Sequence, residues 1–253
     1  PYKNTGEARD DYYCYNMPVT APGDGVVTEV TAVIPDNPVT TTNLEYNWGN
    51  NVIIQHNPEL FSVVCHLKQQ AIPITPGQIV KKGHIIGYCG SSGISPYPHL
   101  HVQFQALGVL GNSTIPVSFS DFLIRYDDYE EYIPVGIPQE EQVVMNVQVD
   151  SSVKKAIGFE LGQTGSYELQ INGRTYREEW RYDMDSTGVL FIESSLYGDR
   201  LYFYRGENSV SFIRYAGRHR GKKLSGLHAL SIGIDKIPFY ASDRLRFNKT
   251  MPY

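Results

Sequence analysis

Short apolar runs that alternate with polar positions, or that are rich in β-branched residues, recur along most of the chain. Each run ends near Gly, Pro, Asn or Asp, and runs of this kind predict β-strands separated by turns. Examples are VVTEVTAVI, NVIIQH, FSVVCHL, HIIGYCG and HLHVQFQ, and later SYELQING, RTYREEWRYD, GVLFIES, DRLYFYRG and SVSFIRY. No repeat of roughly 20–50 residues occurs, which argues against a solenoid or propeller. We therefore expect a mainly β protein built from antiparallel sheets.

The composition changes between residues 121 and 145. The segment DFLIRYDDYEEYIP is acidic and aromatic and favours a short helix, and the following VGIPQEEQ has the composition of a linker. A domain boundary is expected here. The prediction is one compact antiparallel β-sheet domain over residues 1–145 and a second, small antiparallel β-domain over residues 146–253, whose role the sequence leaves open.

The bulk composition indicates a globular chain. Its 253 residues, 41% of them hydrophobic, are enough to fill real cores. No apolar run approaches the roughly 20 residues that span a bilayer, so no transmembrane segment is expected. The net charge of −5 argues against a nucleic-acid partner. One basic cluster, RHRGKKLSG with Arg214 before it, suits a solvated loop better than a binding patch, and the oligomeric state stays open.

The chain begins at Pro1 rather than Met, so we expect that a preceding segment has been removed. Three cysteines are present, Cys14, Cys65 and Cys89. Their number is odd and no CxxC spacing occurs, so they define neither a disulfide framework nor a zinc knuckle. We expect them to be small buried hydrophobes.

The pair His99 and His101 in SPYPHLHVQFQ carries the clearest chemical signal. Positions i and i+2 of a strand share one face, so both imidazoles are expected to point the same way while Leu100 and Val102 face the core. Two neighbouring imidazoles suit metal binding, acid–base chemistry or both. A further histidine, His66, ends the apolar run FSVVCHL, where its ring lies either in the core or at the rim of a sheet.

Several blocks around these histidines occur in one order over residues 7–106. They are NMPVTAPGDGVV, WGNNVIIQH, FSVVCHL, ITPGQIVKKGHIIGYCGSSG and PHLHVQF. In order and spacing they resemble the lysostaphin/LytM-type zinc metalloendopeptidases, a family that cleaves peptidoglycan and has a compact β-sheet fold with a groove. The resemblance implies that fold for the first domain.

The resemblance also implies roles for particular residues. It makes His101 a zinc ligand and His66 and His99 catalytic imidazoles, and it places a carboxylate ligand at Asp11, or failing that at Asp10. Zinc in such a site keeps one position for water, lowers the pKa of that water and polarises the scissile carbonyl. His66 and His99 then suit proton transfer and oxyanion stabilisation, and which residue has which role stays open.

One ligand of the family pattern is missing from this sequence. The family has a histidine in an H-x-x-x-D block, whereas no histidine precedes His56 and the position four before Asp11 is Glu7. Three explanations stay open: a histidine before Pro1, a site in which Glu7 replaces the histidine, or a degenerate site that retains the groove and has lost hydrolysis. Asn4 is a further substitute, although a neutral amide oxygen is a poor zinc ligand.

Two functions follow from the resemblance. The first is a zinc-dependent metalloendopeptidase, with one zinc ion, that cleaves peptide bonds in cell-wall peptidoglycan. The second is a catalytically degenerate module, a pseudoenzyme, that binds wall peptides or regulates a partner hydrolase. Peptidoglycan peptides are the expected partner in both cases. Both imply a location outside the cytoplasm, whether periplasmic, secreted or at the outer surface.

Overall fold

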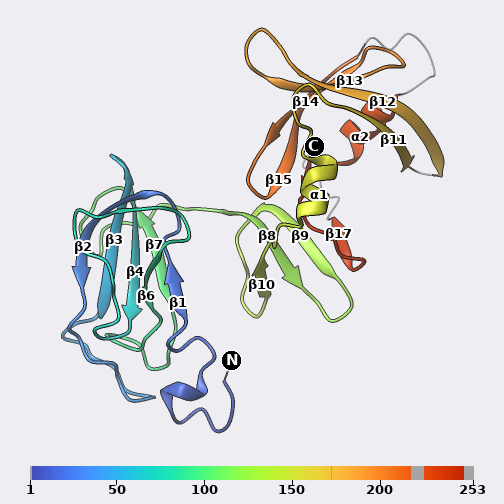
Figure 1. The fold of residues 1–253 in the computed structure, drawn as a ribbon. Coiled ribbons are helices and arrows are strands. Elements are labelled where there is room, and N and C mark those ends of the chain that lie inside the picture. The colour runs from blue at the N-terminus through green and yellow to red at the C-terminus, as the bar shows by residue number, and fades with distance from the viewer. Residues whose placement is uncertain (1, 172, 218–224, 248–253) are drawn as a thin grey trace. The chain divides into compact units, whose positions relative to one another are not determined.

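The computed structural model describes residues 2–171, 173–217 and 225–247, and the chain divides into two compact units, Pro1–Val117 and Ser118–Tyr253 (Figure 1). β-Strands dominate both units. The strand pairings of the described residues are antiparallel except one, between β9 (Glu130–Gly136) and β17 (Leu245–Phe247). The prediction of a mainly β, antiparallel fold is confirmed.

A five-stranded antiparallel sheet forms the frame of the first unit. The strands of this unit are β1 (Pro18–Thr20), β2 (Gly25–Thr31), β3 (Asn50–Asn57), β4 (Leu60–Leu67), β5 (Ile79–Val80), β6 (Ile85–Tyr88) and β7 (His101–Gln105). The large sheet has the order β5-β2-β3-β4-β7, and β1 pairs with β6 in a separate two-stranded sheet. The histidine-bearing strands β4 and β7 are therefore direct neighbours.

Both faces of the central strands are buried, which explains their unbroken apolar sequences. Val52 and Ile54 of β3 join one core cluster, whereas Ile53 between them joins another. Val64 and Val63 of β4 divide between the two clusters in the same way. Successive side chains of a strand point to opposite faces, so a strand buried on both sides needs apolar residues at successive positions. β3 and β4 therefore form the buried centre of the sheet, and β4 carries His66 from this centre to the site.

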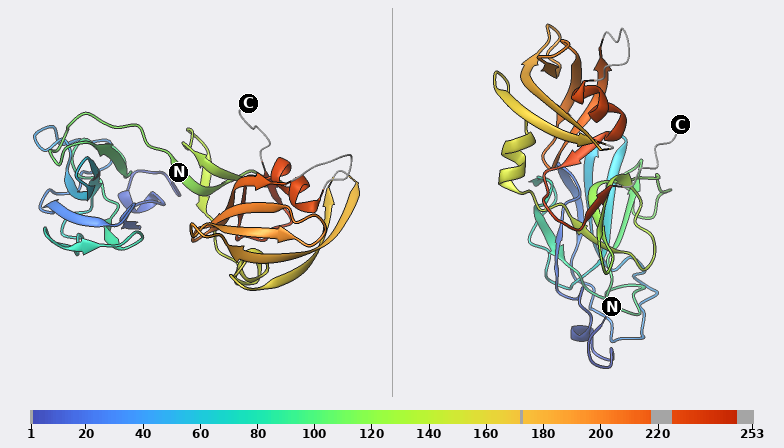
Figure 2. Two further views of the ribbon diagram at one scale, coloured as in Figure 1. Left: turned by 90° about the horizontal axis from the view of Figure 1, so that it is seen from above. Right: turned by 90° about the vertical axis from the view of Figure 1, so that its right-hand side faces the viewer.

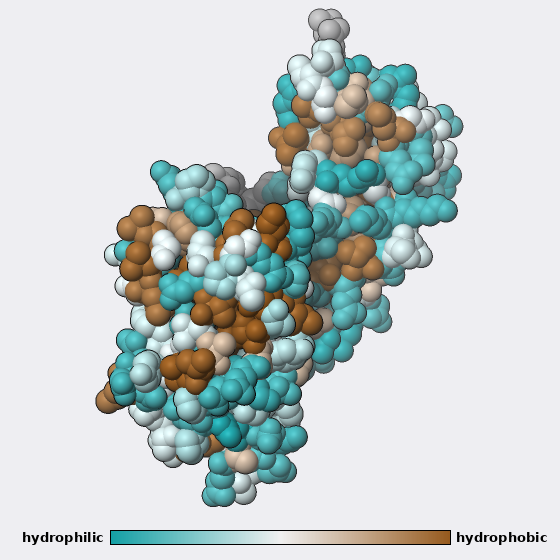
Figure 3. Space-filling model, turned by 60° about the vertical axis from the view of Figure 1, so that its left-hand side comes forward, coloured by the Kyte–Doolittle hydropathy of each residue, from teal (hydrophilic) through white to brown (hydrophobic). Residues whose placement is uncertain are grey.

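The edge strand β7 is more exposed than its sequence suggests. The expectation that Leu100 and Val102 face the core is wrong, because each side chain is 40% exposed. Val102 lies opposite Val64 of the neighbouring β4, and among the described residues no residue of β7 belongs to the core cluster that contains Val64. Figure 3 shows that apolar side chains reach the surface of the protein in separate patches among hydrophilic ones.

The second unit contains a four-stranded and a six-stranded sheet (Figure 2). Besides β9 and β17, its strands are β8 (Phe119–Arg125), β10 (Val143–Asn146), β11 (Thr164–Ile171), β12 (Arg174–Met184), β13 (Leu190–Ser194), β14 (Arg200–Arg205), β15 (Ser209–Ala216) and β16 (Lys236–Pro238). The sheet orders are β10-β8-β9-β17 and β11-β12-β13-β14-β15-β16. The larger sheet follows chain order, and short turns connect its first five strands, β11 to β15.

Two helices accompany the larger sheet, α1 (Ser151–Ile157) and α2 (Gly226–Gly233). The side chain of Asp150 caps α1 by accepting hydrogen bonds from two backbone N–H groups of its first turn. Leu227 and Leu230 of α2 pack into a core cluster with Trp180 of β12. Within the part of the chain that the structure describes, no helix has the length and apolar character needed to cross a membrane.

Residues 119–136 form a hairpin, so the expected short helix in DFLIRYDDYEEYIP is wrong. Phe122 of β8 lies opposite Ile133 of β9, and β9 also pairs with β17. Pairing with strands from elsewhere in the chain outweighs the local preference of an acidic segment. Because of these pairings residues 118–145 group with the C-terminal unit. Of the basic cluster, residues 218–224 lie outside the described residues.

Candidate active site

His66 occupies an uncommon backbone conformation near the end of β4. Its φ is +61°, in the left-handed region that residues other than glycine rarely adopt. The Trp48 carbonyl accepts a hydrogen bond from the His66 N–H at 3.3 Å, and the His66 carbonyl accepts one from the Gly90 N–H at 3.0 Å. Such a conformation costs about 1–3 kcal/mol, and strain of this kind clusters at functional sites. The backbone of His66 thus points to function as well as packing.

The imidazole of His66 is buried, with 5% of the residue exposed. Its Nδ1 lies 2.8 Å from the carbonyl oxygen of Ser92. Because a carbonyl can only accept, Nδ1 carries the proton and Nε2 carries the lone pair. Burial, against the opposing effect of the Ser92 carbonyl and with smaller contributions from the imidazoles of His99 and His101, lowers the pKa of His66 to about 4. At neutral pH this ring is uncharged and its Nε2 can accept a proton.

The three histidines that the sequence singles out meet in one cluster. The ring centroids of His66 and His99 are 4.7 Å apart, and those of His66 and His101 are 5.8 Å apart with the ring planes at 82°. β7 begins at His101, so His99 lies in the loop before the strand. His99 Nδ1 donates to the Tyr97 carbonyl at 2.9 Å, which leaves Nε2 with the lone pair.

A chain of glutamine side chains sets the tautomer of His101. Gln105 Nε2 donates to the carbonyls of Leu107 and Val109, at 2.5 and 2.8 Å, so Gln105 Oε1 is left to accept from Gln103 Nε2 at 3.0 Å. Gln103 Oε1 then accepts from His101 Nε2 at 2.9 Å. The lone pair of His101 is therefore on Nδ1. Metal-binding histidines commonly donate their second ring nitrogen in this way.

Sequence reasoning missed the two glutamines. The signal that could have found them is the strand period, because Gln103 and Gln105 follow His101 at i+2 and i+4 and so share its face of β7. Polar residues repeated on one face of a strand that borders a core indicate a hydrogen-bonded chain more readily than a solvated surface.

Ser92 connects the imidazole cluster to a network of buried hydrogen bonds. Its hydroxyl accepts a hydrogen bond from the Asn50 N–H at 2.9 Å and donates one to the Leu67 carbonyl at 2.8 Å, and the residue is fully buried. The Ser92 carbonyl oxygen accepts the hydrogen bond from His66 Nδ1. Gly49 allows the close approach, since a Cβ there would lie 2.4 Å from the Ser92 carbonyl oxygen. This contact requires glycine at position 49.

Asp11 ends the short 3₁₀ helix η1 (Arg9–Asp11) and is buried. The Asn4 side-chain amide donates to Asp11 Oδ1 at 2.7 Å, and the Ala8 N–H donates to Oδ2 at 3.2 Å. The Asn4 amide, followed by the Ala8 N–H, lowers the pKa of Asp11. Both carboxylate oxygens therefore hold the N-terminal loop together. The neighbouring Asp10 is exposed.

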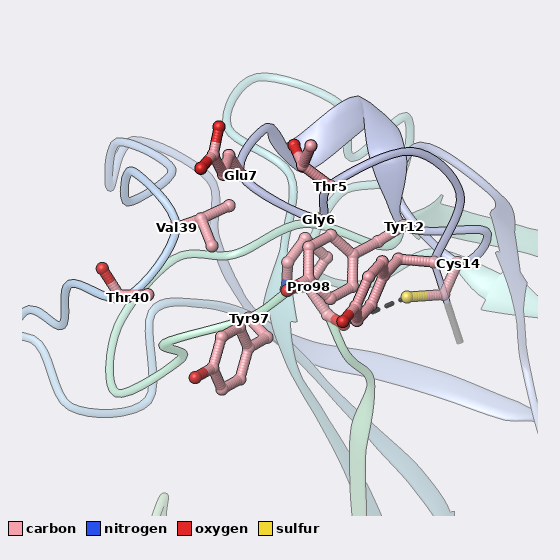
Figure 4. Close-up of a pocket in the computed structure, with 10 residues that line it drawn as sticks. Thr5, Gly6, Glu7, Tyr12, Cys14, Val39, Thr40, Tyr97 and Pro98 are labelled. Carbon is pink, nitrogen blue, oxygen red and sulfur yellow. Dashed lines mark hydrogen bonds between the residues drawn. The ribbon is translucent and has the colours of Figure 1, made fainter.

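The N-terminal segment reaches the loop that carries His99. The rings of Tyr12 and Tyr97 stack with centroids 5.9 Å apart, and Cys14 Sγ donates to the carbonyl of Pro98 at 3.1 Å. Between these segments lies a pocket of about 640 Å³ (Figure 4). Tyrosines, small residues and one carboxylate line it: Tyr2, Thr5, Gly6, Glu7, Tyr12, Cys14, Val39, Thr40, Tyr97 and Pro98. Its size and mixed apolar and polar walls suit a short peptide.

The residues present do not fit a three-ligand zinc site. The lone pair of His101 and the carboxylate of Asp11 have suitable donor chemistry. Over the described ranges, however, no three His, Cys, Asp or Glu side chains come together as a group that could hold a metal ion. Asn4 donates its amide to Asp11, and Glu7 is an exposed residue of the pocket wall. The metal roles of Asp11 and His101 stay predictions.

The imidazoles are thus clustered on a small antiparallel β-sheet, beside a loop that carries a buried carboxylate, as the resemblance to the lysostaphin/LytM-type family implies. In agreement, residues 11–113 match the model of Peptidase family M23. The predicted resemblance to this family is confirmed over these residues.

Three relatives of known sequence match between 36% and 38% of this chain. The "Uncharacterized metalloprotease" of Haemophilus influenzae is 35% identical over 91 residues, which are 36% of this chain and 16% of that protein. "Peptidoglycan DD-endopeptidase ShyA" of Vibrio cholerae is 36% identical over 91 residues, 36% of this chain and 18% of that protein. "Peptidoglycan DD-endopeptidase ShyC" of the same species is 32% identical over 95 residues, 38% and 19%. The chain thus spans less than a fifth of each relative.

Two solved structures are also similar. The catalytic domain of EnpA, a prophage-encoded M23 protein of Enterococcus faecalis, has 25% identity and a TM-score of 0.32, and the match covers 40% of this chain and 67% of that one. The catalytic domain of lysostaphin from Staphylococcus simulans has 24% identity and a TM-score of 0.31, with 45% and 80% covered.

Proposed function

We propose that the N-terminal unit is a degenerate M23 module that binds peptidoglycan peptides at the imidazole cluster and its neighbouring pocket without hydrolysing them. One observation carries the proposal: His66, His99 and His101 are held together, while the described residues offer no group of three metal ligands. The two relatives with a named activity are peptidoglycan DD-endopeptidases, which supports wall peptides as the ligand and a place of action outside the cytoplasm.

In this function the imidazoles bind the peptide through their free ring nitrogens. Fixed hydrogen bonds leave lone pairs at Nε2 of His66 and His99, where backbone N–H groups of a peptide can donate. The stacked rings of Tyr12 and Tyr97 offer an apolar wall for a side chain of the ligand. Because hydrogen bonds already hold these imidazoles in the free protein, peptide binding costs little further side-chain entropy.

Calorimetric titration of the full chain with soluble peptidoglycan fragments tests this function. We expect binding that persists in a metal chelator and no change in the fragments on chromatography. His66→Ala is expected to weaken binding, and His84→Ala is the control because His84 is an exposed histidine of the same unit. Loss of binding in the chelator, or cleavage of the fragments, contradicts the proposal.

Zinc-dependent endopeptidase activity on the same peptides is the second candidate. The hydrogen bond from His101 Nε2 to Gln103 favours it, because this bond leaves Nδ1 free as it is in many metal-bound histidines. Zinc would supply the activated water of the hydrolysis. Stoichiometric zinc in the purified wild-type chain, together with turnover that His101→Ala removes, would establish this candidate in place of the first.

Glu7→His separates the two candidates further. Complete four-ligand zinc sites bind with about 10–16 kcal/mol, so one added ligand is worth roughly 3 kcal/mol, or about a hundredfold in affinity. If the wild-type site lacks a ligand, Glu7→His gains about that factor in zinc affinity by competition with a chelating dye, whereas Glu7→Gln gains none. If the wild type already binds zinc tightly, the histidine adds little and the degenerate site is refuted.

A further inference from the structure

Two of the three cysteines, Cys14 and Cys89, lie on segments whose backbones are hydrogen-bonded to each other. Cys14 lies between η1 and β1, and Cys89 directly follows β6. The Asn16 N–H donates to the Cys89 carbonyl at 2.8 Å and the Cys89 N–H donates to the Met17 carbonyl at 2.9 Å, which keeps the two segments side by side. Cys14 also packs on the core cluster that contains Cys89.

We propose that Cys14 and Cys89 form a disulfide in an oxidising compartment, and that this bond fastens the segment carrying Asp11 to the sheet beside the imidazole cluster. A disulfide requires two cysteines on segments that the fold keeps together; here the backbones of residues 16 and 17 pair with Cys89, and Cys14 packs on the core cluster that contains Cys89. Free cysteines in contact form disulfides outside the reducing cytosol.

The bond also has a consequence for the site. In the thiol form, Cys14 Sγ donates to the Pro98 carbonyl at 3.1 Å, as the dashed line in Figure 4 shows. Pro98 immediately precedes His99. A disulfide sulfur has no proton to donate, so oxidation removes this hydrogen bond and ties the pocket wall to β6 instead. The redox state of Cys14 and Cys89 therefore changes the contacts of Pro98, the residue directly before His99 of the imidazole cluster.

The thiols of Cys14 and Cys89 are suited to different steps of thiol–disulfide exchange with an external disulfide. The hydrogen bond from Cys89 lowers the pKa of Cys14 to about 7, and the same hydrogen bond followed by burial raises the pKa of Cys89. Cys14 is also the more exposed of the two. It is therefore the thiolate that meets an external oxidant, and Cys89 is the thiol that resolves the intermediate.

The reaction needs a small disulfide such as oxidised glutathione. The Cys14 thiolate attacks one sulfur of that disulfide, which forms a mixed disulfide and releases one glutathione thiolate. Cys89 then gives up its proton and its sulfur attacks the sulfur of Cys14, which releases the second glutathione. Two protein thiols are oxidised, one glutathione disulfide is reduced to two thiols, and the two protons end on the two leaving groups.

Cys65 provides an internal control. It is fully buried in β4 within a different core cluster, and burial raises its pKa to about 12. A thiol in this environment is unreactive toward external disulfides. The three cysteines of the chain therefore divide into one reactive pair and one inert thiol.

Thiol counting and peptide mapping test the proposal. The full chain is equilibrated in excess oxidised glutathione, denatured, alkylated and digested without reduction for mass spectrometry. We expect one alkylated thiol, Cys65, and a cross-linked peptide joining Cys14 to Cys89. Cys65→Ala should then show no thiol, while Cys14→Ser should show two and no cross-link. Three alkylated thiols in the wild type, glutathione retained on Cys14, or a cross-link to Cys65 would overturn the pairing.

Hydrogen exchange tests the fastening of the segment. Oxidation is expected to slow exchange of the amides in residues 2–16 by about tenfold or more, because the disulfide restricts opening of this segment. Cys14→Ser should exchange at the same rate with and without oxidant. Equal rates for the oxidised and reduced wild type would refute the tether even if the disulfide forms. Neither readout depends on peptide binding or on metal.

Discussion

Removal of the Ser92 hydroxyl tests whether the imidazole cluster depends on the buried polar network beneath it. Ser92→Ala deprives the Asn50 N–H of its acceptor at 2.9 Å and the Leu67 carbonyl of a donor at 2.8 Å. The Leu67 carbonyl keeps a second donor, the side-chain amide of Asn50 at 2.9 Å. The substitution therefore leaves one buried N–H unpaired and removes one further hydrogen bond.

The expected magnitude follows from these two losses. A buried donor left unpaired costs about 1–3 kcal/mol, and a hydrogen bond whose acceptor keeps another partner is worth about 0.5–1.5 kcal/mol. We therefore expect Ser92→Ala to lower the free energy of unfolding of the N-terminal unit by about 2–4 kcal/mol. The matched control is Ser91→Ala, because Ser91 is equally buried and its hydroxyl makes one hydrogen bond, to the Ser95 carbonyl at 3.0 Å. Its expected cost is about 1 kcal/mol.

Hydrogen exchange read by mass spectrometry resolves this unit from the other. The slowest amides of β3 and β4 exchange through unfolding of the unit, because these strands lie at the centre of its core. At about 1.4 kcal/mol per factor of ten, Ser92→Ala should accelerate their exchange by about 30-fold to several hundredfold, and Ser91→Ala by about fivefold. Equal acceleration in the two variants would refute the assignment of Ser92 as the support of the site.

Two further predictions concern stability. The Tyr240 hydroxyl, 2.7 Å from the carboxylate, lowers the pKa of buried Glu130 below its usual 4.5. The stabilisation that Glu130 contributes is therefore present above pH 4.5 and is lost as the pH falls through the folded-state pKa. In urea titrations at several pH values, Glu130→Gln should flatten this decline in stability at acid pH. Gly93→Ala should lower the melting temperature of its unit more than Gly77→Ala does. Both glycines have positive φ, but a Cβ at position 93 would lie 2.4 Å from the Gly49 nitrogen whereas one at position 77 meets nothing within 4 Å; equal shifts would contradict the steric argument.

Strand existence could be predicted where the local pattern and the burial agree. The apolar runs at residues 51–56 and 61–67 are β3 and β4, because both faces of these strands are covered. The prediction is wrong at residues 119–136, where an acidic segment forms a hairpin. That hairpin is stabilised by pairing with β17 more than 100 residues later, and no local pattern reports such a partner.

The candidate site was likewise predicted only in part. The spacing of His99 and His101 and the order of the surrounding blocks identified the imidazoles and the family. The left-handed backbone of His66 and the glutamine chain behind His101 were not predicted. They depend on which loops and strands pack around each ring.

By itself, the sequence determined the strand content, the resemblance to the M23 family and the residues available for chemistry, since these follow from side-chain period and from ordered motifs. Only the tertiary structure decided which of those residues meet. It brought together the three imidazoles, packed Cys14 on the core cluster that contains Cys89 and engaged both oxygens of Asp11 in the N-terminal loop. Each of these contacts except the local one of Asp11 joins segments distant in the chain. Loop closure and packing, rather than local propensity, set their geometry.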